Sequence, residues 1–448
     1  MNDKNSGGRA PRGFFSIGIE MVTYVCFIHM SGGSAMRSRS RKWLYLPIET
    51  KVREQDAKLL LAYHAVNHGY HVVIGEHRMV EQAAEKLPAG IFLAKGYPKG
   101  YARRVVESLK KYHHKIVELD EEGLFIPDAS RYIRQRMRKA HIDQLDHVCC
   151  WGEHQKQVLT NAYPEMGNRC TVTGNPRFDL LNEVYRELYD PDVKAIQAVY
   201  GSYFLINTRF TFYNPRGGLR ENPALPETQK IKRLCHSFIQ LARILSRTYP
   251  DKNVIFRPHP GESLDVYKEA FKGFTNIHIL REGSVIHWIL AAEAVIHNGC
   301  TTGIEGVVLR KPVISYQPVT HPSGMMDFPD RLSIHAYTDN EVIKILQQST
   351  KPELPDLFFR YYGHPAVPSA CAAILNVLNN QKPAEFSIPS LKRVRFVKDH
   401  REKMKRLFPS FSIEEIDRFF TGLNKLTKEN PLYRIHPLSD RLYLLESL

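Results

Sequence analysis

The sequence predicts an α/β protein with two doubly wound parallel sheets that face each other across a cleft. Short β-branched runs alternate with amphipathic stretches from Trp43 onward, which is the pattern of parallel βαβ units. A chain of 448 residues is long enough for about two to three domains. The polar stretch 182–199 interrupts the alternation and predicts the junction between the domains.

The first domain is expected over residues 41–180. Its predicted strands are 43–48, 70–74, 90–94, 115–119 and 146–151, and its predicted helices include 54–68 and 103–112. Gly69 follows the first helix, in the position where glycine commonly ends a helix. The domain closes with VTGNPRFD at 172–179, where a strand gives way to a Gly-Asn-Pro turn.

The second domain is expected over residues 181–381. It begins with a strand at 203–206 and an amphipathic helix near 230–248. Two later segments, VIFRPHPGE at 254–262 and AVIHNGCTTGIEGVVLRKPVISYQP at 294–318, each contain a β-branched strand that stops at a polar turn. Both turns are therefore predicted at the carboxyl edge of one parallel sheet, where ligands of open α/β sheets bind.

The two ends of the chain differ from this pattern. Residues 1–40 are expected to form a poorly ordered extension without a signal-peptide cleavage site, and the working protein is expected to begin at Met36. Residues 382–448 are expected to form a basic helical tail that includes LKRVRFVKDHREKMKRLF, either a solvated face or a helix for a membrane surface or a partner. Since no 20-residue apolar span occurs, we expect a cytoplasmic protein, or one peripheral at the cytoplasmic membrane surface.

Composition narrows the class of ligand. A net charge of +15 suits acidic ligands, nucleic acid or an anionic membrane surface. No RRM, KH or zinc-finger pattern occurs, so no nucleic-acid partner is expected. The seven cysteines are an odd number without CxxC spacing, which argues against a disulfide framework and against zinc. We therefore expect a reducing compartment and no metal.

A phosphate site is predicted in the segment HNGCTTGIE. The strand before it delivers Asn298 and Gly299 to the sheet edge, and Thr301 and Thr302 follow at the start of a helix. The free N–H groups and the dipole of a helix start favour an anion. Thr302 and Glu305 also have the spacing of a capping box, which would explain the motif without a ligand.

Further polar side chains are predicted at the same sheet edges. Arg257 and His259 end the neighbouring strand and would add a cation and an imidazole to a phosphate cradle. Arg209 ends another strand of the second domain, where it would contact a phosphate or a sugar carboxylate, and Glu49 follows the first strand of the first domain. The acidic loop ELDEEG at 118–123 also follows a strand, and it is either part of the site or a solvated loop.

Three of these motifs together resemble a known group. ELDEEG, the pair His259 and Pro260, and the hydroxyl pair Thr301 and Thr302 are similar to motifs of bacterial GT-B glycosyltransferases that use CMP-activated acidic sugars, the sialyl- and Kdo-transferases. The segments YLPIETKVRE, TGNPRFDLL and HNGCTTGIE resemble bacterial surface carbohydrate biosynthesis proteins of capsule and lipopolysaccharide. The resemblance covers about residues 43–381 and implies two Rossmann-like domains in a GT-B-like arrangement.

The resemblance also implies roles for single residues. His259 would contact the donor phosphate, Thr301 and Thr302 would hold the same phosphate, and Glu305 would face the nucleotide ribose. Glu121 or Glu122 would be the catalytic base that takes the proton of the acceptor hydroxyl. The implied reaction is metal-independent and cofactor-independent transfer of a sugar, such as Kdo or sialic acid, from a nucleotide-sugar donor to a glycan or lipid-linked glycan acceptor.

Two other enzyme classes fit the same residues. A nucleotide-sugar 2-epimerase shares the two-domain architecture and would convert its substrate with no acceptor present. A CDP-glycerol-type phosphotransferase is similar at His259 and at the hydroxyl pair, and would move a phosphodiester from a CDP-alcohol. These remain the alternatives to glycosyl transfer.

Overall fold

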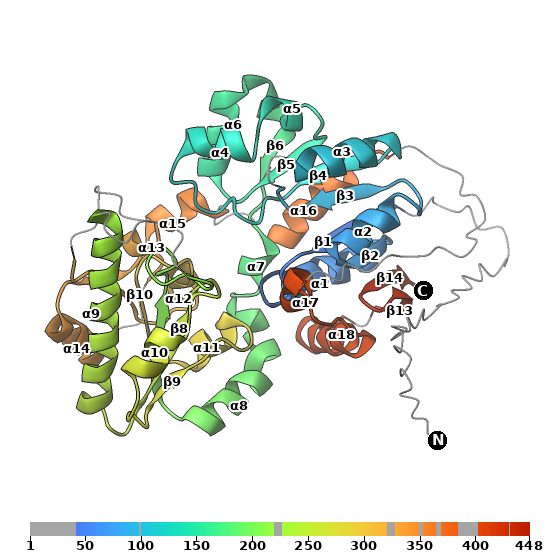
Figure 1. The fold of residues 1–448 in the computed structure, drawn as a ribbon. Coiled ribbons are helices and arrows are strands. Elements are labelled where there is room, and N and C mark those ends of the chain that lie inside the picture. The colour runs from blue at the N-terminus through green and yellow to red at the C-terminus, as the bar shows by residue number, and fades with distance from the viewer. Residues whose placement is uncertain are drawn as a thin grey trace, which may run out of the picture.

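The computed structural model describes residues 42–97, 100–218, 226–319, 328–348, 353–363, 369–383, 402–429 and 431–448. They form two α/β domains that lie side by side, each with a sheet between helices (Figure 1). The predictions for residues 1–40, including a start at Met36, lie outside the described residues, and so does the basic segment 391–401.

The first sheet has a parallel body of six strands. These are β1 Trp43–Ile48, β2 His71–Glu76, β3 Ile91–Ala94, β4 Lys115–Glu118, β5 His147–Cys150 and β6 Cys170–Val172. They lie in the order β2-β1-β3-β4-β5-β6. The strands are rich in Val, Ile, Leu and Cys and are buried on both faces, as parallel strands between helices require.

Helices cover both faces of this sheet and supply its core contacts. They are α1 Lys51–Asn67, α2 His77–Ala84, α3 Tyr101–Lys111, α4 Ala129–Gln135, α5 Lys139–Ile142 and α6 Glu153–Ala162. Helix α1 is the most deeply buried of the N-terminal helices, with the consecutive residues 59–63 all fully covered. Its first turn follows β1 directly, so α1 begins at the carboxyl edge of the sheet.

The second sheet is parallel throughout. Its order is β12-β11-β10-β7-β8-β9, and the strands are β7 Tyr203–Thr208, β8 Asn253–Pro258, β9 Ile277–Ile279, β10 Ala294–His297, β11 Val313–Tyr316 and β12 Ile334–Ala336. The helices around it are α9 Pro226–Thr248, α10 Asp265–Ala270, α11 Val285–Ala291, α12 Thr302–Val308, α13 Phe328–Arg331 and α14 Asp339–Gln347. Two doubly wound domains were predicted, and the structure confirms them.

Each sheet has one point at which strand addition changes direction. In the first sheet this switch point lies between β1 and β3, and in the second it lies between β7 and β10. The loops after the two strands leave in opposite directions there and open a crevice, which is where open α/β sheets bind ligands. Glu49 follows β1, whereas Asn207 on β7 lies in register with His297 on β10.

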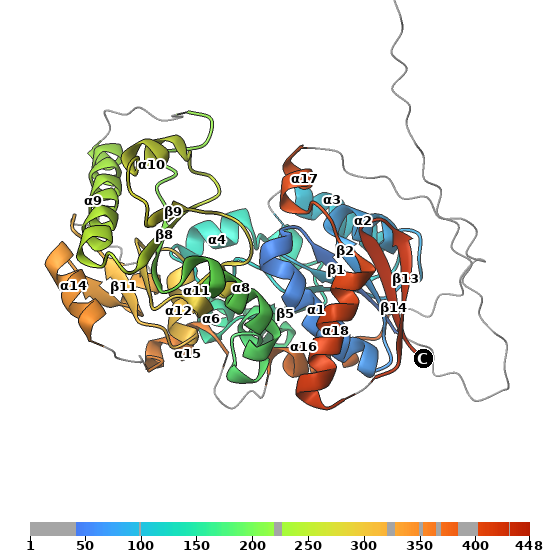
Figure 2. The same ribbon diagram turned by 90° about the horizontal axis from the view of Figure 1, so that it is seen from below.

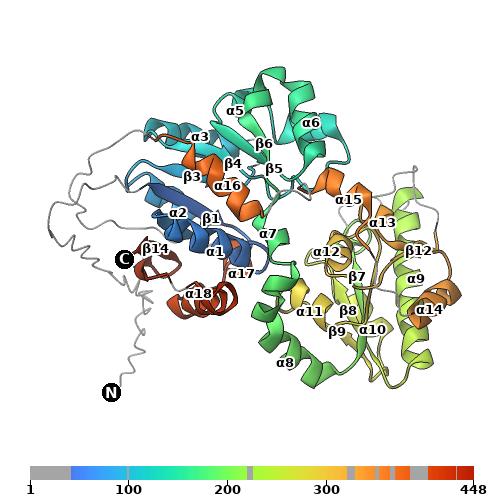
Figure 3. The same ribbon diagram turned by 180° about the vertical axis from the view of Figure 1, so that it is seen from behind.

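The chain crosses between the domains more than once. It leaves the first domain through α7 Pro176–Asp179, the 3-10 helix η2 Glu183–Tyr189 and α8 Asp190–Tyr200. After α15 Asp356–Tyr361 it returns as α16 Ala370–Asn379, which packs on α1 (Figure 3). The carboxylate of Asp179 accepts the backbone N–H groups of Ala370 and Cys371, each at 2.9 Å. The predicted second domain, 181–381, was therefore wrong at its end, because α16 belongs to the first domain.

The C-terminal residues complete the first sheet. Helices α17 Glu402–Leu407 and α18 Ile413–Thr427 are followed by β13 Tyr433–Ser439 and β14 Leu442–Ser447. Strand β14 pairs antiparallel with β2 and covers its edge (Figure 2). The prediction of a helical tail over 382–448 was wrong here, because Tyr443 and Leu445 alternate with Leu442 and Leu444 on the two faces of a sheet.

No helix in the described part of the chain is long and apolar enough to cross a membrane.

Candidate functional site

A cavity of about 350 Å³ lies between the two domains. The first domain and the connection contribute Thr50, Arg53, Asp56, Arg177 and Tyr189 to its lining, and the second domain contributes Asn207, Arg257, His259, Arg281, Thr301, Thr302 and Glu305 among others. The second set comes from the ends of β7, β8 and β10 and, for Arg281, from the loop after β9. The cavity therefore opens at the switch point of the second sheet and faces α1 of the first.

The start of α12 does not form the capping box that its sequence allows. The residue before the helix is Thr301, and its side chain makes no capping hydrogen bond. Glu305 instead accepts a hydrogen bond from Arg177 Nη2 at 3.2 Å. Burial raises the pKa of Glu305, while the charge of Arg177 opposes that rise. The buried Thr302 Oγ1 has no oxygen or nitrogen partner among the described residues and lies beside the Cys300 thiol, a weak partner that a ligand oxygen could replace.

His297 stabilises the turn between β10 and α12 through hydrogen bonds of its ring. Its Nδ1 accepts the Gly299 N–H at 3.0 Å, and its Nε2 lies 2.9 Å from the Ser333 hydroxyl. Burial lowers the pKa of His297 to about 4, so the ring is neutral. Gly299 has φ +78°, a conformation that side chains disfavour. Asn298 and Gly299 shape the turn without lining the cavity.

Arg209 links the turns after β7 and β10. Its Nη1 donates to the Gly299 carbonyl at 3.4 Å, and its own carbonyl accepts from Asn298 Nδ2 at 3.4 Å. Asn207, two residues earlier, is only 4% exposed and lines the cavity. Its Nδ2 has no partner among the described residues. A buried amide without a partner points to a ligand that accepts its hydrogen bond.

Arg257 is a buried cation held by backbone oxygens. Its guanidinium donates to the carbonyls of Glu282 at 2.8 Å, Arg281 at 3.3 Å and Gly283 at 3.4 Å. It also lies over the ring of Trp288, 5.1 Å from the centroid. Burial lowers the pKa of Arg257 to about 10, which still leaves it charged at neutral pH. Arg257 therefore shapes the loop after β9 and gives the cavity a fixed positive charge.

His259 stands at the end of β8 and lines the same cavity. Burial, together with the charges of Arg209 and Arg281, lowers its pKa. The ring is therefore neutral at pH 7, so it can donate a hydrogen bond to an anion without adding a charge.

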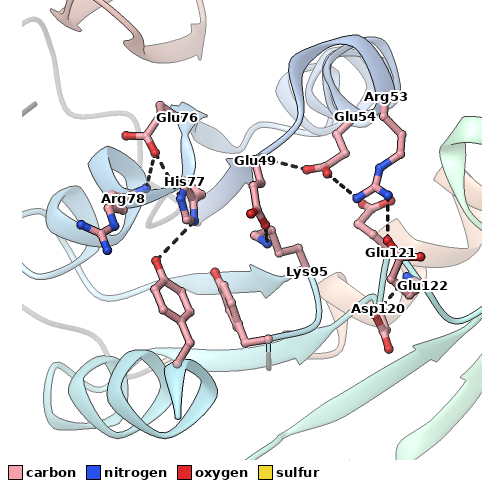
Figure 4. Close-up of polar contacts among 12 residues, drawn as sticks. Glu49, Arg53, Glu54, Glu76, His77, Arg78, Lys95, Asp120, Glu121 and Glu122 are labelled. Atoms are coloured by element: carbon pink, nitrogen blue, oxygen red, sulfur yellow. Dashed lines mark hydrogen bonds and ion pairs between the residues drawn. The ribbon is translucent and has the colours of Figure 1, made fainter. Parts of the chain in front are cut away.

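The acidic loop after β4 is not a solvated loop. Glu121 is buried, with Oε1 3.0 Å from Lys58 Nζ and Oε2 3.9 Å from Arg177 Nη1. Burial would raise the pKa of Glu121, but the charges of Lys58, Arg177 and Arg53 outweigh it and lower that pKa. Glu122 is exposed and accepts from Arg53 Nη1 at 2.7 Å (Figure 4). Neither glutamate lines the cavity, but each contacts an arginine that does.

Two further pairs fix the edge of the first sheet. Asp120 is fully buried and is bound by Arg136, whose Nε donates at 2.8 Å, and by the Tyr132 hydroxyl at 3.0 Å. Glu49 pairs with Lys95 at the switch point between β1 and β3, and both side chains are labelled in Figure 4. Glu49 does not line the cavity.

The catalytic and binding roles predicted for Glu121, Glu122, His259 and the other candidates stay predictions.

Sequence patterns missed two residues that organise the site. Arg177 forms ion pairs with Glu121 of the first domain and with Glu305 of the second. Glu262 accepts a hydrogen bond from the backbone N–H of His259. The local signal for Arg177 was its place after the Gly-Asn-Pro turn, but its partners are distant in sequence. Within the described ranges, no group of three or more His, Cys, Asp or Glu residues could hold a metal ion.

Comparisons with known proteins show the fold. No protein-family model and no curated protein matches the chain. A Listeria monocytogenes protein assigned as a UDP-N-acetylglucosamine 2-epimerase is similar at 13% identity and a TM-score of 0.51, covering 78% of this chain and 100% of that one. Another UDP-N-acetylglucosamine 2-epimerase matches at 13% identity and 0.50, covering 78% and 99%. The wall teichoic acid polymerase TagF matches at 12% and 0.50, covering 76% and 88%.

These matches confirm the predicted class of fold, two Rossmann-like domains in a GT-B-like arrangement. They also correct the prediction of function. Transfer of a CMP-activated acidic sugar was expected, but 2-epimerases, the predicted alternative, share the fold over the whole of their length. The prediction of a glycosyltransferase was therefore wrong. That prediction rested on short motifs, HP and a hydroxyl pair, which predict an anion site without specifying the reaction.

Proposed function

We propose that this chain is a nucleotide-sugar 2-epimerase, which binds its nucleotide in the second domain and inverts the sugar carbon C2 beside the first. The observation that carries the proposal is the buried Asn207 Nδ2, which has no partner among the described residues and lies with Thr302 in a cavity at the switch point of the second sheet. A buried polar group without a partner costs about 1–3 kcal/mol. A ligand with acceptor oxygens would remove that cost.

The charges around the cavity support an anionic ligand. Four guanidinium groups line it, those of Arg53, Arg177, Arg257 and Arg281, against the two carboxylates of Asp56 and Glu305. Guanidinium groups match phosphate oxygens in geometry and charge. A nucleoside diphosphate sugar supplies two phosphates, and UDP-N-acetylglucosamine, named for the 2-epimerases of this fold, is the substrate to test first.

Inversion at C2 defines the chemistry that the other domain must supply. A base takes the C2 proton from one face, the electron pair of that C–H bond forms a C1=C2 double bond, and the C1–O bond to the nucleotide phosphate breaks. A proton from an acid then adds to C2 on the opposite face while the phosphate oxygen forms its bond to C1 again. Glu122 is an exposed carboxylate held by Arg53, which itself lines the cavity. We assign the removal of the C2 proton to Glu122. Glu121, buried against Lys58, instead fixes Arg177 in place.

The test is incubation of the full chain with UDP-N-acetylglucosamine in deuterated water, without an acceptor, followed by NMR. The proposal expects the C2 epimer to form with deuterium at C2. Glu122→Gln should lower the rate by about 10²-fold or more while UDP still binds. Glu165→Gln, an exposed carboxylate that neither lines the cavity nor contacts an arginine of its lining, is the control and should keep the full rate.

Two results would overturn the proposal. One is UDP-N-acetylglucosamine recovered without deuterium at C2 after prolonged incubation with folded protein. The other is release of CMP from CDP-glycerol when a lipid-linked glycan is added as the acceptor, which would support the phosphotransferase alternative.

A further inference from the structure

The buried carboxylate of Glu262 holds together the loops that follow β7 and β8 at the cavity. Glu262 is fully buried, and its Oε1 accepts the backbone N–H of Phe210 and of His259, each at 3.0 Å, and the Thr208 hydroxyl at 3.1 Å. The Tyr267 hydroxyl donates to Oε2. Phe210 follows β7 and His259 follows β8, so Glu262 sets the spacing between the two loops.

Arg281 fastens the same turn through its carbonyl groups. Its guanidinium donates to the backbone oxygens of Pro258 at 3.3 Å, His259 at 3.1 Å and Glu262 at 2.6 Å. Both backbone polar groups of His259 are thus bound, the N–H by Glu262 and the carbonyl by Arg281. The backbone of His259 cannot shift without breaking one of these bonds.

The fixed turn decides which ring nitrogen of His259 carries the proton. The Gly261 N–H donates to Nδ1 of the ring at 3.1 Å. A nitrogen that accepts a hydrogen bond bears no proton, so in the neutral ring the proton lies on Nε2. The ring lines the cavity, and Nε2 is the nitrogen left to meet a ligand there.

We infer that Glu262 is a positioning residue whose carboxylate holds His259 as a neutral hydrogen-bond donor, with Nε2–H presented to the cavity. Glu262 touches no ligand and acts through the turn that brings Gly261 to Nδ1. That the acceptor is a phosphate oxygen of the nucleotide rests on the proposed function, whereas the tautomer of His259 does not.

The tautomer can be measured directly in the full chain labelled with ¹⁵N-histidine. His259→Gln identifies the signals by their loss. The wild-type ring should be neutral at pH 7, with a protonated Nε2 and a bare Nδ1. Glu262→Gln, with folding checked by its urea midpoint, should show a mixture of the two tautomers, because the turn is no longer fixed. Glu269→Gln, exposed on α10, is the matched control and should keep the wild-type spectrum.

Three outcomes would overturn the inference: a wild-type ring protonated on Nδ1, a cationic ring at pH 7, or a folded Glu262→Gln with the wild-type tautomer. If Glu262→Gln does not fold, Arg281→Lys replaces it, because lysine cannot reach all three carbonyls. This variant should also mix the tautomers, and an unchanged spectrum would contradict the role of the fixed turn.

Calorimetry with UDP then links the tautomer to binding. Glu262→Gln and His259→Gln should each weaken UDP binding about tenfold, the scale of one hydrogen bond to a charged oxygen. In a chain that already carries His259→Gln, Glu262→Gln should add no more than about twofold, since coupled residues are not additive. A full tenfold loss there would refute action through His259. If the wild type does not bind UDP, the proposed function fails, and the ¹⁵N spectrum still decides the inference.

Discussion

Replacing Lys58 with Met tests whether a buried ion pair fixes the acidic loop. The Lys58 and Glu121 side chains are 3% and 5% exposed, and the two charges lie 3.0 Å apart. Without Lys58, the Glu121 carboxylate keeps only the more distant Arg177 as a direct ion-pair partner, at 3.9 Å. Removing one member of a buried pair costs about 3–5 kcal/mol, because an uncompensated charge stays buried. We expect about 3 kcal/mol here, since Arg177 retains part of the attraction.

The pH dependence of this loss has a definite sign. In the wild type the pKa of Glu121 lies below its ordinary value of 4.5, so its stabilising effect is present above that pH and is lost as the pH falls through the lowered value. In Lys58→Met burial dominates, and the pKa of Glu121 rises above 4.5. The variant then regains stability as the pH falls. The stability difference between variant and wild type should shrink by about 1 kcal/mol or more from pH 7 to pH 5, the equivalent of one pKa unit.

Urea unfolding of wild type and variant at pH 7 and pH 5 measures both quantities. Lys110→Met is the control, since its pair with Asp146 has side chains 33% and 16% exposed and should be worth less than about 1 kcal/mol. Adding Glu121→Gln to Lys58→Met should restore part of the loss. The reasoning is refuted if Lys58→Met costs no more than Lys110→Met, or if the difference is the same at both pH values.

Three further predictions follow from the site and its connection. Asn207→Asp should weaken UDP-N-acetylglucosamine binding at least about tenfold in calorimetry, because it replaces a buried donor by an anion, and unchanged affinity would remove Asn207 from the site. Burial raises the pKa of Asp56 to about 6, so affinity should rise as the pH falls from 8 to 5, and Asp56→Asn should flatten that profile. Asp179→Ala should cost about 2–3 kcal/mol in urea unfolding, because two buried N–H groups lose their acceptor, and a loss under about 0.5 kcal/mol would contradict the role of this contact.

Local sequence patterns predict where strands lie along the chain, but they do not predict which strands pair with each other. β-branched runs that end at polar turns predicted β8 and β10 and placed His259 and Thr302 at one sheet edge, because parallel strands point the same way. Strand β14 was not predictable in the same way. Its partner β2 lies more than 350 residues away in the sequence, and no local feature of LYLLES specifies that pairing.

The capping box expected at the start of α12 does not form, because Glu305 binds a residue that is distant in the sequence instead of its neighbours. The Thr302 and Glu305 spacing satisfies the rule for a capping box, which uses only neighbours within one helical turn. Arg177 lies 128 residues from Glu305, and its charge-assisted bond outweighs a neutral N–H donor. The acidic loop behaves similarly, since Lys58 and Arg177 convert a pattern typical of a solvated loop into a buried ion pair.

The carboxylates near the cavity are held by arginines, and in the proposed epimerase this would couple binding to chemistry. Glu122 is bound by Arg53 and Glu305 by Arg177, and both arginines line the cavity. A diphosphate bound as proposed would compete for these guanidinium groups, which form two parallel hydrogen bonds to phosphate oxygens as readily as to carboxylates. When Arg53 turns to the phosphate, Glu122 loses its partner. The proposed base would thereby become free only when a nucleotide is present, so proton abstraction would be confined to the bound substrate.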